Sequence, residues 1–66
     1  MIKKVREMIA EAEADGWRQV RQEGSHRQYH HPTKTGTVTI PGHPGDDLDH
    51  RMVASIRTQM KGQQHG

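Results

Sequence analysis

The side chains best suited to catalysis gather in the middle of the chain, where four histidines stand at positions 26, 30, 31 and 43. His26 directly follows Gly24-Ser25, a pair typical of a turn between two strands. A residue that opens a strand after such a turn can project from the edge of a sheet. Imidazole, with an unperturbed pKa of about 6.5, exchanges protons readily near neutral pH. His26 is therefore a candidate general base or general acid–base.

Cleavage of RNA without a metal is one reaction that such a group can support. The neighbouring 2′-hydroxyl attacks the phosphodiester, and a base must take its proton. Because DNA lacks this hydroxyl, the chemistry would be confined to RNA. Gly24 would let the chain turn and let a phosphodiester approach the backbone. The competing interpretation of His26 is a surface residue whose ring hydrogen-bonds the turn.

The other histidines have several interpretations. On a strand, His26 and His30 point to one face, while Tyr29 and His31 point to the other. His30 is a candidate second acid that protonates the leaving 5′-oxygen, or a plain surface residue. His31, which precedes a proline, is interpreted as structural and as fixing the following turn. For His43, between Gly and Pro, a functional and a structural role are both open.

A metal site built from these histidines is disfavoured by their spacing. The chain contains no cysteine, and the histidines match no zinc-binding pattern. Strand alternation also separates His30 from His31. We expect neither a metal nor another cofactor.

Basic residues in the same segment are candidate phosphate contacts. The net charge is only +2, but residues 16–44 contain four Lys and Arg residues and only one acidic residue, Glu23. Phosphate contacts supply salt-dependent affinity with little sequence preference. The candidate RNA-binding residues are Gly24, Ser25, Arg27, Lys34, Arg21 and His30, with Lys3 or Lys4 as further possibilities.

The hydrophobic pattern changes along the chain. Two segments have apolar side chains at helical spacing, residues 2–14 and the segment after Leu48. In the second segment these side chains are Met52, Val53, Ile56 and Met60. Asp49 or Asp47 would cap the second helix, and Gly62 would end it. Residues 17–22, 26–31 and 37–40 are predicted strands. Trp17 and Val20 break the alternation, so the first strand is bulged or Trp17 lies before it.

These elements predict an α+β fold in the order α-β-β-β-α. Three antiparallel strands would form a sheet with both helices on one face. The 66 residues, 29% of them hydrophobic, suffice for one domain over residues 1–61, followed by a frayed tail over 62–66. So small a core predicts marginal stability, which a homo-oligomer or a tightly bound partner would raise. No apolar run is long enough for a membrane span or a signal peptide, so we expect a soluble, cytoplasmic protein.

The ordered motifs of the chain resemble the HicA family of toxins from bacterial and archaeal toxin–antitoxin systems. The matching pieces are Gly16-Trp17, Gly24-Ser25-His26, Tyr29, His31-Pro32, residues 37–41, His43-Pro44 and Leu48. The resemblance implies a double-stranded-RNA-binding-like fold and metal-independent endoribonuclease activity on mRNA. It also implies that His26 is the catalytic residue and that a HicB-like antitoxin neutralises the toxin. The last helix, which begins Asp49-His50-Arg51-Met52, departs from the Gly-Thr-Leu-like start of many relatives.

Two other functions remain open on the sequence. The first is a non-catalytic RNA-binding module in which His26 is only a turn residue. The second is an interaction domain that serves its protein partner alone. Because Gly24-Ser25-His26 is intact, the sequence favours the ribonuclease.

Overall fold

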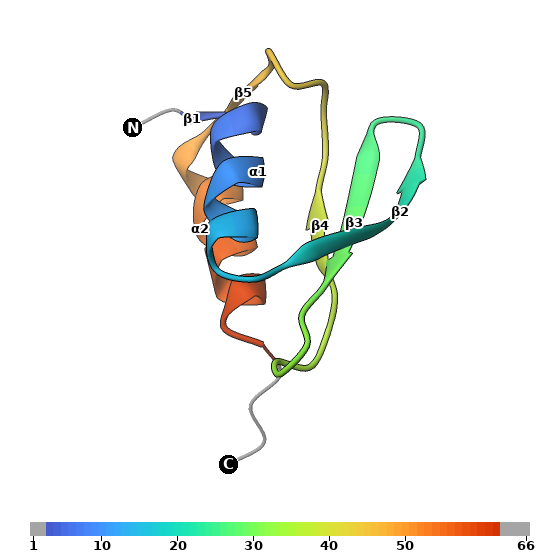
Figure 1. Cartoon of the computed structure of the whole chain (residues 1–66). Coiled ribbons are helices and arrows are strands. Elements are labelled where there is room, and N and C mark those ends of the chain that lie inside the picture. The colour runs from blue at the N-terminus through green and yellow to red at the C-terminus, as the bar shows by residue number, and fades with distance from the viewer. Residues whose placement is uncertain (1–2, 63–66) are drawn as a thin grey trace.

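The computed structural model describes residues 3–62 of the chain. Two helices, α1 and α2, and five strands follow one another along these residues (Figure 1). In chain order they are β1 (Lys3–Lys4), α1 (Val5–Ala14), β2 (Arg18–Glu23), β3 (His26–His30), β4 (Val38–Ile40), β5 (Asp47–Leu48) and α2 (His50–Met60). None of the helices in this part of the chain is long and apolar enough to cross a membrane.

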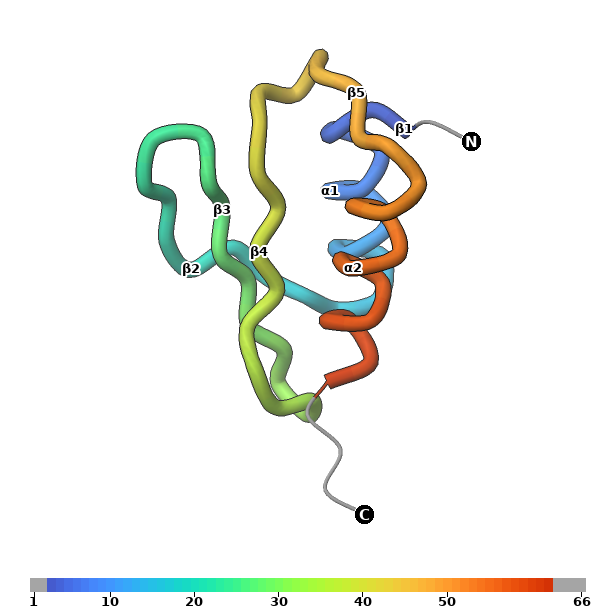
Figure 2. Tube along the Cα trace, turned by 180° about the vertical axis from the view of Figure 1, so that it is seen from behind, coloured from blue at the N-terminus to red at the C-terminus, as the bar shows by residue number. Residues whose placement is uncertain are grey.

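The helices form one layer and the main sheet forms the other. Strands β2, β3 and β4 are antiparallel neighbours in the order β2-β3-β4, and both helices lie on one side of them (Figures 1 and 2). The β2–β3 hairpin extends away from the helical layer on the far side of β4. The predicted α+β fold, with a three-stranded antiparallel sheet and two helices, is confirmed.

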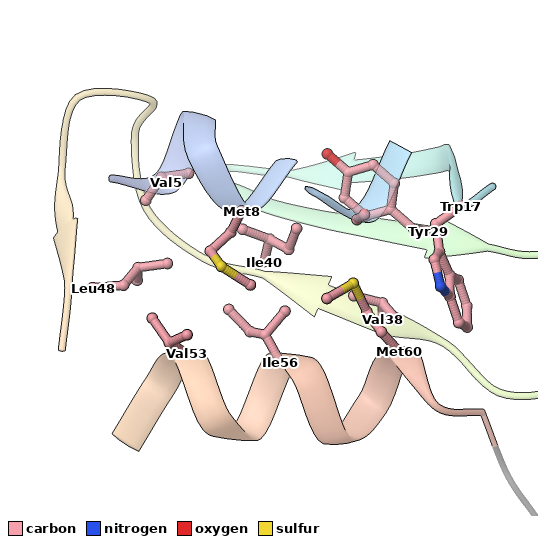
Figure 3. Close-up of a cluster of buried hydrophobic side chains, with 11 residues drawn as sticks. Val5, Met8, Trp17, Tyr29, Val38, Ile40, Leu48, Val53, Ile56 and Met60 are labelled. Carbon is pink, nitrogen blue, oxygen red and sulfur yellow. The ribbon is translucent and has the colours of Figure 1, made fainter. Parts of the chain in front are cut away.

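The hydrophobic core lies between the two layers. Figure 3 shows side chains of α2 pointing toward those of α1 and β4. The core side chains are all less than 8% exposed: Val5, Met8, Ala12, Trp17, Tyr29, Val38, Ile40, Leu48, Val53, Ile56 and Met60. The sequence prediction that Met52 joins this core is wrong, because its side chain is 40% exposed. Met52 lies about 100° round the helix from Val53, beyond the narrow stripe that Val53, Ile56 and Met60 form.

The first helix begins later than its hydrophobic pattern predicts. Lys3 and Lys4 are extended because they pair with Leu48 and Asp47 in a second, two-stranded sheet. Helix α1 then starts at Val5, and the Lys4 backbone N–H donates to the Glu7 carboxylate at 2.7 Å. Ile2, which was predicted to belong to the helix, lies outside the described residues.

Both irregularities predicted for the first strand are present. Trp17 precedes β2, and the pairing with β3 shifts between Gln19 and Arg21, which places Val20 at a bulge. A bulge leaves one residue unpaired, and the Val20 side chain is exposed, as are those of the other β2 residues.

The second helix has the predicted ends. The Asp49 carboxylate accepts a hydrogen bond from the Met52 backbone N–H at 2.9 Å, so Asp49, and not Asp47, is the N-cap. At the other end, the Gly62 N–H donates to the Gln59 carbonyl, and Gly62 has a φ of +81°. The rest of the predicted tail, residues 63–66, lies outside the described part of the chain.

Candidate active site

The turn that carries His26 is a tight two-residue hairpin connection. Glu23 at the end of β2 pairs with His26 at the start of β3, and Gly24 and Ser25 join them. Gly24 has a φ of +59°, whereas no residue other than glycine has a positive φ in the described chain. Glycine first in the turn is typical of the type II′ connection, whose twist matches that of the flanking strands. Local sequence thus places His26 at the tip of the hairpin, where its side chain is exposed.

His26 lies on the face of the sheet that points away from the helices. Tyr29 on β3 is buried in the core, so the alternating residues His26, Gln28 and His30 face the other way. Glu23 and Arg21 of β2 lie on the same outward face, because they pair with His26 and Gln28 of β3. This outward face of the hairpin is therefore polar and accessible to a large ligand.

Arg21 is the predicted phosphate contact that the structure places near His26. Its guanidinium lies 3.2 Å from the Glu23 carboxylate, and both side chains are more than 60% exposed. The two residues stand on the same face of β2, one alternation apart. Arg21 therefore brings positive charge to the face that carries His26.

Arg27 occupies a different position from the one expected of an RNA contact. It pairs with Ile40, so its side chain leaves β3 on the side of the helices. There its guanidinium donates to the Gly42 carbonyl at 2.8 Å, with the Ser25 carbonyl 3.5 Å away. Arg27 thus joins the hairpin turn to the loop after β4.

Lys34 lies beyond the opposite end of β3 from His26. Its ammonium group is 2.6 Å from the Asp15 carboxylate and 3.3 Å from the Met60 carbonyl oxygen. The hydrogen bond from Lys34, together with one from the Trp17 indole N–H, holds the pKa of Asp15 below its ordinary value. Lys34 therefore ties the ends of the two helices together and is not brought to the hairpin tip.

His30 and His31 have the separate environments that strand alternation predicts. The His30 ring on the outward face lies 3.2 Å from the Thr37 hydroxyl. His30 lies four positions along the strand from His26, a span of roughly 13 Å. That distance is too long for both imidazoles to act on one phosphate.

His31 is structural, as predicted. Its Nδ1 accepts hydrogen bonds from the backbone N–H groups of Thr33 and Lys34, at 3.0 and 3.1 Å. Nε2 must then carry the proton, and it donates to the Asp15 carbonyl at 2.8 Å. The ring also meets Trp17 edge-on, with centroids 5.1 Å apart. His31 thus fixes the turn after β3 to the end of α1.

His43 is exposed in the loop between β4 and β5. Its backbone N–H donates to the Asp46 carboxylate at 2.9 Å, and its carbonyl accepts from the Asp46 N–H. This loop is the one that Arg27 joins to the hairpin turn. Across residues 3–62, no three His, Asp or Glu side chains converge as a metal site would require.

Sequence reasoning overlooked Glu23 as a neighbour of His26. The signal was present, because a two-residue turn at Gly24-Ser25 necessarily pairs the residues on either side of it. Alternation along β3 alone does not reveal this neighbour, because Glu23 lies on the other strand of the hairpin.

No characterised protein gave a significant match to the chain. The HicA toxins of bacterial toxin–antitoxin systems match over residues 5–61, which include both helices and the main sheet. The chain belongs to the HicA toxin family and is the toxin component of a toxin–antitoxin system.

Proposed function

We propose that the protein is a metal-independent endoribonuclease that cleaves mRNA, with His26 as a catalytic residue. The observation that supports this most is the position of His26, exposed at the tip of a hairpin on the sheet face opposite the helices. An imidazole there can reach a phosphodiester that lies across the outward face. Cleavage of mRNA would stop translation and growth, which accounts for the toxicity of the family.

The reaction needs proton transfer and stabilisation of charge on the phosphate. The 2′-hydroxyl attacks phosphorus, the bond to the 5′-oxygen breaks, and the products carry a 2′,3′-cyclic phosphate and a 5′-hydroxyl. His26 would transfer a proton in this exchange. Arg21 on the same face would contact the phosphate oxygens. Gly24, where an added Cβ would meet no atom within 4 Å, leaves space for the substrate beside the turn.

Toxin–antitoxin pairing implies a cognate antitoxin, and we propose that it is a HicB-like protein that covers His26. A freely active ribonuclease would cut the messages of its own cell. Covering the hairpin tip would block the substrate without any change in the fold.

The test is cleavage of an end-labelled RNA by the purified protein in EDTA, beside the His26→Ala variant. We expect the intact chain to cut and to leave 2′,3′-cyclic phosphate ends, and the variant to bind RNA without cutting it. The matched control is His50→Ala, which removes an exposed imidazole from α2, outside the hairpin, and should keep the activity. Uncut RNA with folded wild-type protein would instead support a non-catalytic module that binds RNA or a protein partner.

A further inference from the structure

Glu23 is the acidic residue that the hairpin places beside His26. Directly paired residues on one face of an antiparallel ladder have Cβ atoms about 5 Å apart. Glu23 and His26 are such a pair, at the last position before the turn. A carboxylate and an imidazole therefore project side by side from the hairpin tip.

The charged surroundings of this pair are simple. Beside this pair, the outward-facing charged groups of β2 are Arg18 and Arg21, and the only other titratable group on the outward face of β3 is His30. Strand β4 contributes the uncharged Thr39 opposite Gln28, and its ladder with β3 begins at Arg27, one residue short of the tip. Arg18 donates to the backbone carbonyls of Glu13 and Trp17, away from the turn.

Arg21 contacts the Glu23 carboxylate. The two side chains form an ion pair of 3.2 Å along the outward face. A guanidinium has five N–H donors, so Arg21 can keep this contact while it also binds a phosphate oxygen. An exposed carboxylate in this position would otherwise repel a polyanion, and the ion pair offsets that repulsion.

Resting on the ribonuclease function proposed above, we propose that Glu23 is the general base of the cleavage and His26 its general acid. The Glu23 carboxylate takes the proton of the 2′-hydroxyl as the 2′-oxygen bonds to phosphorus. The bond from phosphorus to the 5′-oxygen breaks, and the His26 imidazolium gives its proton to that oxygen. Protons and electrons balance without any co-reactant. His26 returns to its charged form by taking a proton from water, and Glu23 releases its own.

The geometry suits this division of roles. The attacking and leaving oxygens lie on opposite sides of phosphorus, so the two groups must flank one phosphate. Side chains that start about 5 Å apart can do so, whereas His30, roughly 13 Å along the strand, is too far away.

The pH dependence of cleavage tests the assignment with purified full-length protein and a short end-labelled RNA. A carboxylate base and an imidazolium acid predict a bell-shaped profile of kcat/KM, with an acidic limb from Glu23 and an alkaline limb from His26. Glu23→Gln should lower kcat about 100-fold, the lower end of the range for one general base, and remove the acidic limb. Glu23→Asp keeps the carboxyl group and should retain that limb at a reduced rate.

The matched control is Glu13→Gln, which removes one exposed acid from α1 and should leave the rate and both limbs unchanged. Circular dichroism shows whether each variant is folded. An unchanged rate and acidic limb in folded Glu23→Gln would overturn the assignment while leaving His26 catalysis intact. Loss of the acidic limb in His43→Ala, and not in Glu23→Gln, would overturn it as well. Folded wild-type protein that cuts no RNA would overturn the ribonuclease function itself.

Discussion

The guanidinium of Arg27 donates a hydrogen bond of 2.8 Å to the carbonyl oxygen of Gly42, fifteen residues further along the chain. The bond joins the hairpin turn, which carries the proposed site, to the loop that carries His43. Backbone pairing of β3 with β4 does not extend this far toward the turn. The Arg27 side chain therefore adds a contact between the hairpin turn and the loop just beyond the end of the ladder, where Arg27 pairs with Ile40.

Replacing Arg27 with methionine should destabilise the protein. Methionine keeps an apolar stem but removes the donors to the carbonyls of Gly42 and Ser25. Hydrogen bonds to charged groups contribute about 1.5–3 kcal/mol, and partial exposure reduces this to about 1–2 kcal/mol. Urea unfolding measures the loss. Arg51→Met, at an exposed position of α2, is the control and should change the free energy of unfolding by less than about 0.5 kcal/mol. Equal effects of the two substitutions would contradict the role assigned to Arg27.

His31 should be a neutral Nε2–H tautomer in the folded protein. Its Nδ1 accepts two backbone hydrogen bonds and cannot also hold a proton. Nitrogen-15 chemical shifts of the ring at neutral pH report the tautomer directly, and a protonated Nδ1 would contradict the hydrogen bonds described here. His31→Ala should lower stability by about 2 kcal/mol, because it leaves the N–H groups of Thr33 and Lys34 without their acceptor. His30→Ala, on the outward face, should be close to neutral.

Two glycines should differ in their tolerance of a side chain. At Gly16, φ is +105° and an added Cβ would lie 2.7 Å from Nε2 of His31. At Gly24, φ is +59° and an added Cβ would meet open space. Gly24→Ala should therefore cost only the backbone strain, about 1–2 kcal/mol. Gly16→Ala adds the displacement of His31 and should cost more. Thermal unfolding of both variants checks the order, and the reverse order would show that His31 yields readily.

Acidification should weaken the fold through two ion pairs. Hydrogen bonds from Arg57 lower the pKa of Glu11 below its ordinary 4.5, and the hydrogen bond from Lys34 lowers the pKa of Asp15 below its ordinary 3.8. A carboxyl group with a depressed pKa in the folded state stabilises it above the unfolded pKa, and the benefit is lost as the pH falls through the folded pKa. The melting temperature should thus begin to fall near pH 4.5 and continue below pH 3.8. Glu11→Gln should flatten the upper part of this fall, and an unaltered pH profile would exclude the Glu11–Arg57 pair as its cause.

Tyr29→Phe should be neutral or stabilising at neutral pH. The Tyr29 side chain is buried, and its hydroxyl has no hydrogen-bond partner among the described residues. Burial raises the pKa of this hydroxyl, which keeps it uncharged in the folded protein. Removing a buried polar atom that makes no hydrogen bond restores the free energy that its desolvation costs. Thermal unfolding is the measurement, and a marked loss of stability would reveal a partner for the hydroxyl.

Alternation and turn chemistry were sufficient to predict the main features of the fold and the exposure of His26. The Gly24-Ser25 turn fixed the register, and the buried Tyr29 fixed which face of β3 points outward. The catalytic role of His26 stays a prediction, since position alone does not demonstrate proton transfer.

The partners of the basic residues could not be predicted in the same way. Arg27 and Lys34 were predicted to contact phosphate, yet each donates a hydrogen bond to a residue 15 or more positions away in the chain. Such contacts depend on how loops pack after the elements have formed, and no local pattern encodes them. The prediction for Met52 was wrong for a related reason. Helical spacing alone does not determine how wide a face of the helix is buried, because that width depends on the elements that pack against it.

Gln59 of α2 occupies a backbone donor at the edge of the main sheet. Its side-chain oxygen accepts the backbone N–H of Thr39 at 2.8 Å, on the outer edge of β4. At the opposite edge, the bulge at Val20 interrupts β2. Exposed, regular strand edges are templates on which further chains add and aggregates grow. Here one edge is closed by a side chain and the other is irregular, so neither offers a continuous ladder to a second copy. We therefore expect the main sheet to resist the edge-to-edge addition of further copies at both β2 and β4.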